Sequence, residues 1–68
     1  MKDSISNNVQ AHRKNLGLTQ QELAEIIGVT RQTVISIEKG NYVPSVSLAL
    51  KISEAFNTSV EKIFLLNN

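Results

Sequence analysis

Cysteine and tryptophan are absent from this 68-residue sequence, which also has only one histidine, one proline and one tyrosine. Without cysteine the chain has no disulfide or thiolate chemistry, a composition suited to a reducing compartment. The lone His12 has no cysteine or cluster of carboxylates with which to share a metal ion. Neither a nucleophile motif nor a phosphate-binding glycine loop is present. We therefore expect no enzymatic activity, metal, cofactor or small-molecule ligand.

Long hydrophobic runs are also missing. No segment approaches the roughly 20 apolar residues that span a bilayer, and the N-terminus M-K-D-S-I-S-N-N lacks the apolar centre of a signal peptide. These absences predict a soluble, cytoplasmic chain with no membrane partner. The length predicts a single domain, 1–68, whose core is small, and a small core favours association with a second copy.

Charge of one sign is not in excess, because seven Lys and Arg residues oppose six Asp and Glu residues. The net charge of +1 is much lower than that of a strongly basic nucleic-acid binder. Lys14, Arg31 and Lys39 fall in the first part of the chain, however, whereas Glu54 and Glu61 lie near its end. This distribution allows a nearly neutral chain to present one positive face.

Apolar residues recur three and four positions apart, which is the period of an amphipathic helix, and no strand pattern of useful length appears. We predict an all-α fold of five helices at about 4–15, 19–27, 30–39, 45–56 and 58–64. The predicted inward-facing residues are Ile5, Val9, His12, Leu16, Leu23, Ala24, Ile27, Val34, Ile37, Leu48, Ala49, Ile52, Phe56, Val60, Ile63 and Phe64.

Capping and turn residues mark the helix ends. The run T-Q-Q-E at 19–22 predicts a capping box, in which a hydroxyl and a carboxylate satisfy free backbone amides, and T-S-V-E at 58–61 predicts a second one. Thr30 is the predicted N-cap of the third helix. Pro44 disfavours helical geometry at the preceding residue, so it predicts a loop at 41–44.

Residues 20–39 carry the pattern of a tight helix-turn-helix. Ala24 is small where two helices have to approach closely, Gly28 permits the positive φ of a sharp turn, and Val34 and Ile37 face the preceding helix. The opposite face of the helix at 30–39 carries Arg31, Gln32, Ile35, Ser36 and Lys39. Arg and Gln side chains can pair with guanine and adenine edges in the DNA major groove. A polar helix face is usually only a solvated surface, but the tight turn before this one favours DNA recognition.

Residues 18–40 read L-T-Q-Q-E-L-A-E-I-I-G-V-T-R-Q-T-V-I-S-I-E-K-G, and they are followed by N-Y-V-P-S and by a helix that ends A-L-K-I-S-E-A-F. This sequence resembles the phage repressor and Cro family of helix-turn-helix regulators, also called the XRE family. The resemblance covers about residues 9–64. It implies a five-helix fold, transcriptional control, most often repression, and a homodimer that binds double-stranded DNA at a two-fold-symmetric operator.

Matching positions give the DNA contacts that the resemblance implies. The base readers would be Arg31, Gln32 and Ser36, and Thr33 would lie near a phosphate or a base edge. The phosphate contacts would be Gln20, which can also support a base reader, Lys39 and Asn41. Tyr42 either joins these contacts or packs under the loop, because its side chain is amphipathic.

Three other features stay outside the predicted DNA contacts. Arg13 and Glu38 match a family ion pair between the first and third helices, which would have a structural role. His12 stands where relatives usually carry an aliphatic residue, and a packed side chain is favoured there over a pH sensor. Ile35 either contacts a thymine methyl group or leans on neighbouring Arg and Lys stems.

The segment 59–68 is a predicted dimer contact, because Leu65 and Leu66 add an apolar pair beyond the last helix. Such a contact would set two recognition helices about 34 Å apart, one turn of DNA. The alternative function is a protein-interaction module, such as an antitoxin or an anti-repressor partner, that keeps the fold without binding DNA. The modest net charge favours this alternative slightly, whereas the polar face of the third helix counts against it.

Overall fold

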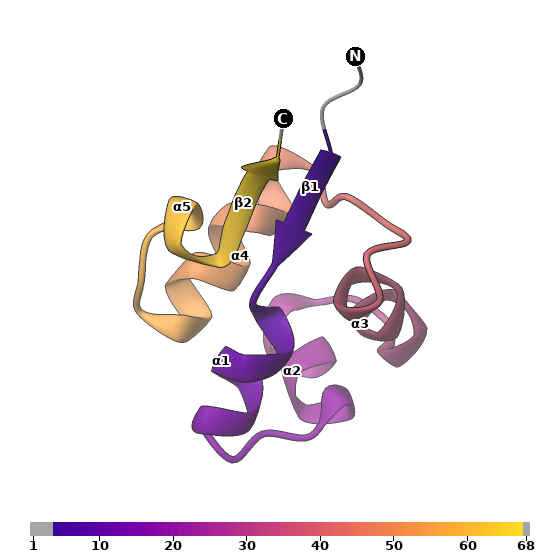
Figure 1. Cartoon of the computed structure of the whole chain (residues 1–68). Helices are drawn as coiled ribbons and strands as arrows, with labels where there is room; N and C mark the ends of the chain where they lie inside the picture. The colour runs from indigo at the N-terminus through magenta and orange to yellow at the C-terminus, as the bar shows by residue number, and fades with distance from the viewer. Residues whose placement is uncertain (1–3, 68) are drawn as a thin grey trace.

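The computed structural model describes residues 4–67 as five short helices and a two-stranded antiparallel sheet (Figure 1). In chain order the elements are β1 Ser4–Asn7, α1 Val9–Asn15, α2 Gln20–Ile27, α3 Arg31–Glu38, α4 Val46–Phe56, α5 Val60–Ile63 and β2 Phe64–Asn67. The sheet brings the two ends of the described chain side by side, away from α1 and α2. Within residues 4–67, none of the helices is long and apolar enough to cross a membrane.

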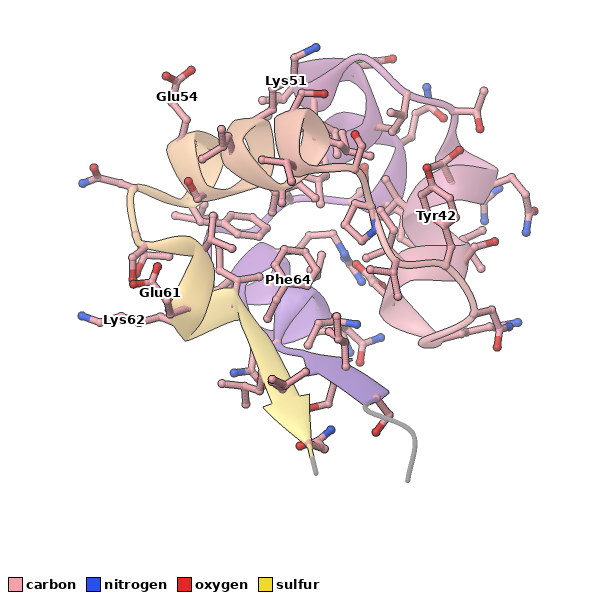
Figure 2. All side chains as sticks on the ribbon, turned by 90° about the horizontal axis from the view of Figure 1, so that it is seen from above. Tyr42, Lys51, Glu54, Glu61, Lys62 and Phe64 are labelled. Carbon is pink, nitrogen blue, oxygen red and sulfur yellow. The ribbon has the colours of Figure 1, made fainter. Side chains whose placement is uncertain are left out.

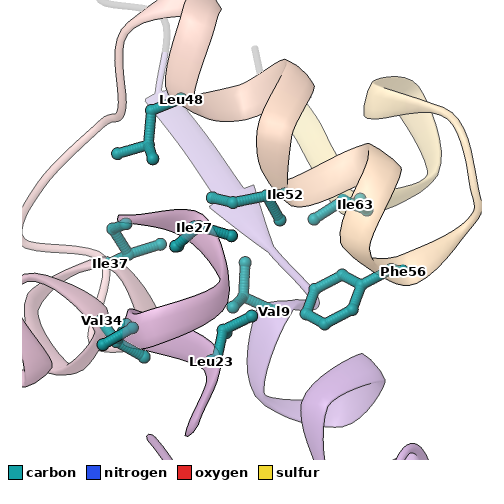
Figure 3. Close-up of a cluster of buried hydrophobic side chains, with 10 residues drawn as sticks. Val9, Leu23, Ile27, Val34, Ile37, Leu48, Ile52, Phe56 and Ile63 are labelled. Atoms are coloured by element: carbon teal, nitrogen blue, oxygen red, sulfur yellow. The ribbon is translucent and has the colours of Figure 1, made fainter. Parts of the chain in front are cut away.

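The core lies where all five helices meet. Its ten buried hydrophobic side chains, most of them labelled in Figure 3, are Val9, Leu23, Ala24, Ile27, Val34, Ile37, Leu48, Ile52, Phe56 and Ile63. Within α2, α3 and α4 these residues recur at the predicted spacing of three or four, so each of these helices turns one apolar stripe inward, whereas α1 and α5 contribute one buried hydrophobic residue each. These ten inward-facing predictions are confirmed. Ile5 and Leu16 are instead exposed, Ile5 on β1 and Leu16 at the C-cap of α1.

The sheet corrects two predictions, the all-α fold and the helix at 4–15. Strand β1 pairs with β2 in a register that places Ile5 opposite Leu66 and Asn7 opposite Phe64. Helix α1 therefore begins only at Val9, whose N–H donates to the Asn7 Oδ1 atom at 3.0 Å. The two strands come from opposite ends of the chain, so no local pattern of spacing revealed their pairing.

The helix ends follow the predicted capping residues in most places. Thr19 Oγ1 accepts the Glu22 N–H at 3.0 Å while Glu22 Oε1 accepts the Thr19 N–H at 2.8 Å, which completes the first capping box. The Thr30 hydroxyl caps α3. The second predicted box, at 58–61, is wrong, because α5 as described begins after Ser59 and has no side-chain cap.

Candidate nucleic-acid interface

The turn between α2 and α3 is built by Gly28. Its φ of 75° and ψ of 36° are left-handed, and the N–H groups of Gly28 and Val29 both donate to the Ala24 carbonyl at the end of α2. A Cβ atom placed on Gly28 would meet no atom within 4 Å, so backbone conformation rather than space explains the glycine. The predicted positive φ is confirmed.

Helix α3 is held by its apolar side. Val34 and Ile37 are fully buried against the rest of the core, and Ala24 of α2, also buried, permits the close approach of the two helices. A side chain from the sheet adds a polar contact that the sequence did not suggest, because Asn7 Nδ2 donates to the Ile37 carbonyl at 2.8 Å. The opposite side of α3 is thereby fixed in orientation.

That opposite side borders a shallow groove of about 320 Å³ between α3 and the loop after it. The groove, here called the α3 groove, is lined by Thr30, Gln32, Thr33, Ser36, Asn41 and Tyr42. The loop is held in place because the Asn41 N–H donates to the Ser36 carbonyl at 2.9 Å. Four of the seven predicted DNA contacts therefore lie together: Gln32, Thr33, Ser36 and Asn41.

The other three predicted contacts lie outside the groove lining. Arg31 and Lys39 are exposed at the two ends of α3, Arg31 as its first residue and Lys39 as its C-cap. Gln20 is half-buried, and its Nε2 atom donates to Glu38 Oε1 at 3.2 Å. Tyr42 is partly exposed and lines the groove, with its ring on the loop that follows α3 (Figure 2).

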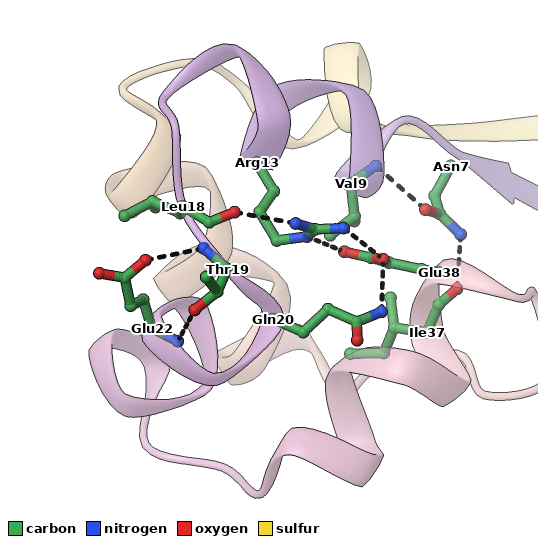
Figure 4. Close-up of polar contacts among 9 residues, drawn as sticks. All are labelled: Asn7, Val9, Arg13, Leu18, Thr19, Gln20, Glu22, Ile37 and Glu38. Carbon is green, nitrogen blue, oxygen red and sulfur yellow. Dashed lines mark hydrogen bonds and ion pairs between the residues drawn. The ribbon is translucent and has the colours of Figure 1, made fainter.

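The predicted Arg13–Glu38 pair is present and nearly buried (Figure 4). Arg13 Nε lies 2.6 Å from Glu38 Oε2, Nη2 donates to Oε1 at 3.2 Å, and Nη1 donates to the Leu18 carbonyl at 2.8 Å. The pKa of Arg13 is raised above its ordinary value, chiefly by the hydrogen bond to Glu38. Because this pair turns the carboxylate of Glu38 inward, the negative charge at the end of α3 is neutralised beneath the surface.

The imidazole ring of His12 packs against an aromatic side chain. It stacks on Phe56 with ring centroids 5.3 Å apart and planes inclined by 19°. Among residues 4–67 no group of three His, Cys, Asp or Glu side chains is placed to hold a metal ion.

This arrangement of α2, a tight turn and an exposed α3 is the geometry of a helix-turn-helix. The model of the helix-turn-helix family matches residues 9–63. The chain belongs to this family. An uncharacterised HTH-type transcriptional regulator from Methanothermobacter thermautotrophicus is 55% identical over 60 residues, which cover 87% of each chain. The regulator YgzD of Bacillus subtilis, also described as uncharacterised, is 52% identical over 62 residues, covering 91% of this chain and 94% of YgzD.

A solved structure agrees with this membership of the helix-turn-helix regulators. The restriction-modification controller protein C.AhdI from Aeromonas hydrophila superposes with a TM-score of 0.74 at 28% identity, covering 79% of this chain and 82% of C.AhdI. The family that the sequence resembles is thus confirmed, and with it a role in transcriptional regulation. Asn7, which fixes α3, and the link from Gln20 to Glu38 are the site features that sequence reasoning missed.

Proposed function

We propose that this helix-turn-helix regulator binds double-stranded DNA through the exposed side of α3 and represses transcription as a homodimer on a two-fold-symmetric operator. The observation that carries the proposal is that one side of α3 is buried in the core while the other side is polar and exposed. Val34 and Ile37 lock α3 into the core, whereas Arg31 and Gln32 stand exposed on its first turn. A single helix held this way fits the width of the DNA major groove.

The proposed role of each residue is the one that the family resemblance implies, and its position on or beside α3 supports it. Base edges would be read from the exposed side of α3 by Arg31, Gln32 and Ser36, with Thr33 near a phosphate or a base edge. Phosphates would be held at the ends of the helix pair by Gln20, Lys39 and Asn41. The N-terminus of α3 adds its own positive dipole at the DNA surface.

Gln20 has a more specific role in this proposal. One N–H of its amide group is used by Glu38 at 3.2 Å, which leaves the second N–H to donate to a phosphate oxygen. Glu38 is in turn held by Arg13 at 2.6 Å. The structural ion pair would thereby orient a DNA contact, because the carboxylate at its centre serves both partners.

A symmetric operator follows from a symmetric protein. Two copies related by a two-fold axis present two α3 helices, so their binding site is an inverted repeat with half-sites about 34 Å apart. A dimer bound there would cover promoter DNA and repress transcription in the cytoplasm. The chain would act as one binding domain, 1–68, without enzymatic activity.

Salt-dependent DNA binding tests the proposal. Sites would be selected from random duplex DNA, and their affinity would be measured by fluorescence anisotropy over a range of salt concentrations. We expect inverted repeats, and an affinity that falls steeply with salt because bound phosphates release counterions. Lys39→Ala should lower the slope of log K against log salt by about one.

Lys62→Ala is the matched control, because Lys62 is exposed on α5, far from Tyr42 and the α3 groove in Figure 2. It should leave the slope unchanged. Equal slopes for Lys39→Ala and the unmodified protein would refute the phosphate assignment. A complete lack of salt-dependent binding would instead favour the protein-interaction module.

A further inference from the structure

The C-terminal end of α3 is closed by a Schellman motif. The Asn41 N–H donates to the Ser36 carbonyl at 2.9 Å, and the Gly40 N–H donates to the Ile37 carbonyl at 2.9 Å. Gly40 has the left-handed backbone that this motif requires, with a φ of 79°. The motif sets the direction in which the chain leaves α3, so it sets where Lys39 and Asn41 lie relative to the helix.

The Ile37 carbonyl accepts a second hydrogen bond, from a residue that lies 30 positions earlier in the sequence (Figure 4). Asn7, the last residue of β1, donates to it from Nδ2 at 2.8 Å. Among residues 4–67, this is the one hydrogen bond that joins the backbone of α3 to another helix or strand. The Schellman motif moves with the helix, whereas the bond from Asn7 ties the end of the helix to the rest of the domain.

The two halves of the Asn7 amide make different contacts. Its Oδ1 atom accepts the Val9 N–H at 3.0 Å, which is a local contact at the start of α1. An aspartate would supply the same acceptor, but it would have no N–H to donate. The contact with Val9 therefore does not explain why this residue is an asparagine, whereas the contact with α3 does.

We propose that Asn7 is a positioning residue for DNA binding. By holding the Ile37 carbonyl it fixes the end of α3, and with it Lys39 and Asn41, the two phosphate contacts proposed there. Asn7 is half-buried and both polar atoms of its side chain are engaged within the protein, so it acts through α3 rather than by touching DNA. This inference rests on the proposed function, because it needs the phosphate contacts at this end of the helix.

The bond from Asn7 holds the direction of α3 more directly than the ion pair beside it. Glu38 is held through its side chain, by Arg13 at 2.6 Å and by Gln20 at 3.2 Å. A side chain can turn about its own torsions, whereas a backbone carbonyl moves only with the helix. A small tilt of the helix end matters for Asn41, because its short side chain cannot follow a phosphate and hydrogen bonds weaken steeply away from their usual length and angle.

The test compares the DNA affinity of Asn7→Ser with that of the matched control Asn8→Ser. Asn8 Nδ2 donates to the Lys62 carbonyl at 3.3 Å, so each variant loses one bond from a side chain to a carbonyl and neither changes the charge. Affinity for a selected inverted repeat would be measured by fluorescence anisotropy, at a temperature where circular dichroism shows every variant to be folded. Asn7→Ser should bind about tenfold more weakly, or about threefold for each half-site, a loss in the range of one hydrogen bond. Asn8→Ser should bind as the unmodified protein does.

A double-mutant cycle separates positioning from a general loss of stability. In a protein that already carries Lys39→Ala and Asn41→Ala, Asn7→Ser should cause no further loss of affinity, because the contacts that it positions are gone. A merely structural role would give the full loss in this background as well. The preference for particular base pairs should stay the same, since phosphate contacts do not read sequence.

Asn7→Asp is a second variant, which keeps the acceptor for the Val9 N–H and turns an oxygen instead of a donor toward the Ile37 carbonyl. Its control is Asn8→Asp, which adds the same charge one residue away. Equal affinities for the variants at 7 and 8, or a loss that persists without the side chains of Lys39 and Asn41, would overturn the inference. These results would leave the proposed function standing, whereas a lack of salt-dependent DNA binding by the unmodified protein would overturn both.

Discussion

Replacing Glu38 with glutamine should remove a large part of the stability of this domain. The carboxylate accepts from Arg13 at 2.6 and 3.2 Å and from Gln20 at 3.2 Å. Its side chain is 4% exposed and that of Arg13 is 9% exposed, so Glu38→Gln would strand a nearly buried positive charge. Breaking such a pair from one side costs about 3 to 5 kcal/mol.

That cost is large for a chain of 68 residues. At about 0.05 to 0.15 kcal/mol per residue, the whole domain is stable by only about 3 to 10 kcal/mol. Urea unfolding followed by far-ultraviolet circular dichroism would measure the loss, with all proteins at one concentration because association changes apparent stability. With a slope of about 1 kcal/mol per M, the midpoint should fall by about 3 M or more.

Two further variants separate charge from packing. Glu25→Gln, at an exposed position on α2, should change stability by no more than about 0.5 kcal/mol. The double variant Arg13→Met with Glu38→Leu should be more stable than either single variant, because it leaves no unpaired charge. A loss below about 1 kcal/mol for Glu38→Gln, or a double variant no more stable than its singles, would refute the reasoning.

Three other changes test the site and its support. Gln32→Ala should cost about 1 to 3 kcal/mol of DNA binding at particular base pairs, measured on operator variants; a uniform loss at every base pair would contradict base reading. Gly28→Ala should lower the free energy of unfolding, measured in urea, by about 1 to 2 kcal/mol, because alanine disfavours the left-handed backbone at this position. The added Cβ has room, so a much larger loss would show that packing also matters. Asn7→Ala removes the hydrogen bonds of the Asn7 side chain to the Ile37 carbonyl at 2.8 Å and from the Val9 N–H at 3.0 Å. It should lower the free energy of unfolding by about 1 to 3 kcal/mol and speed hydrogen exchange at the Val9 amide. An unchanged exchange rate would count against the contact with Val9.

Much of this protein was predictable because it depends on interactions between near neighbours. The spacing of Leu23 and Ile27, and of Val34 and Ile37, marks helices whose apolar stripes meet, and the structure buries all four. The capping box at 19–22 begins a helix and the glycine at 28 ends one, and both do so through contacts within about one turn of the chain. The same local pattern, with the family resemblance, was enough to identify a helix-turn-helix.

Tertiary structure alone decided what joins distant parts of the chain. Ile5 fits a helical spacing with Val9, yet pairing with Leu66 makes its segment a strand, because backbone hydrogen bonds to a distant segment outweighed local propensity. The same pairing sends Leu65 and Leu66 to opposite faces of the sheet and places Ile5 and Phe64, which lie far apart in the sequence, beside Val46 at the start of α4. Gln20 likewise gained its contact with Glu38 only when α2 and α3 packed together. Such contacts have no signature in the spacing of neighbours, since they depend on which segments the folded chain brings side by side.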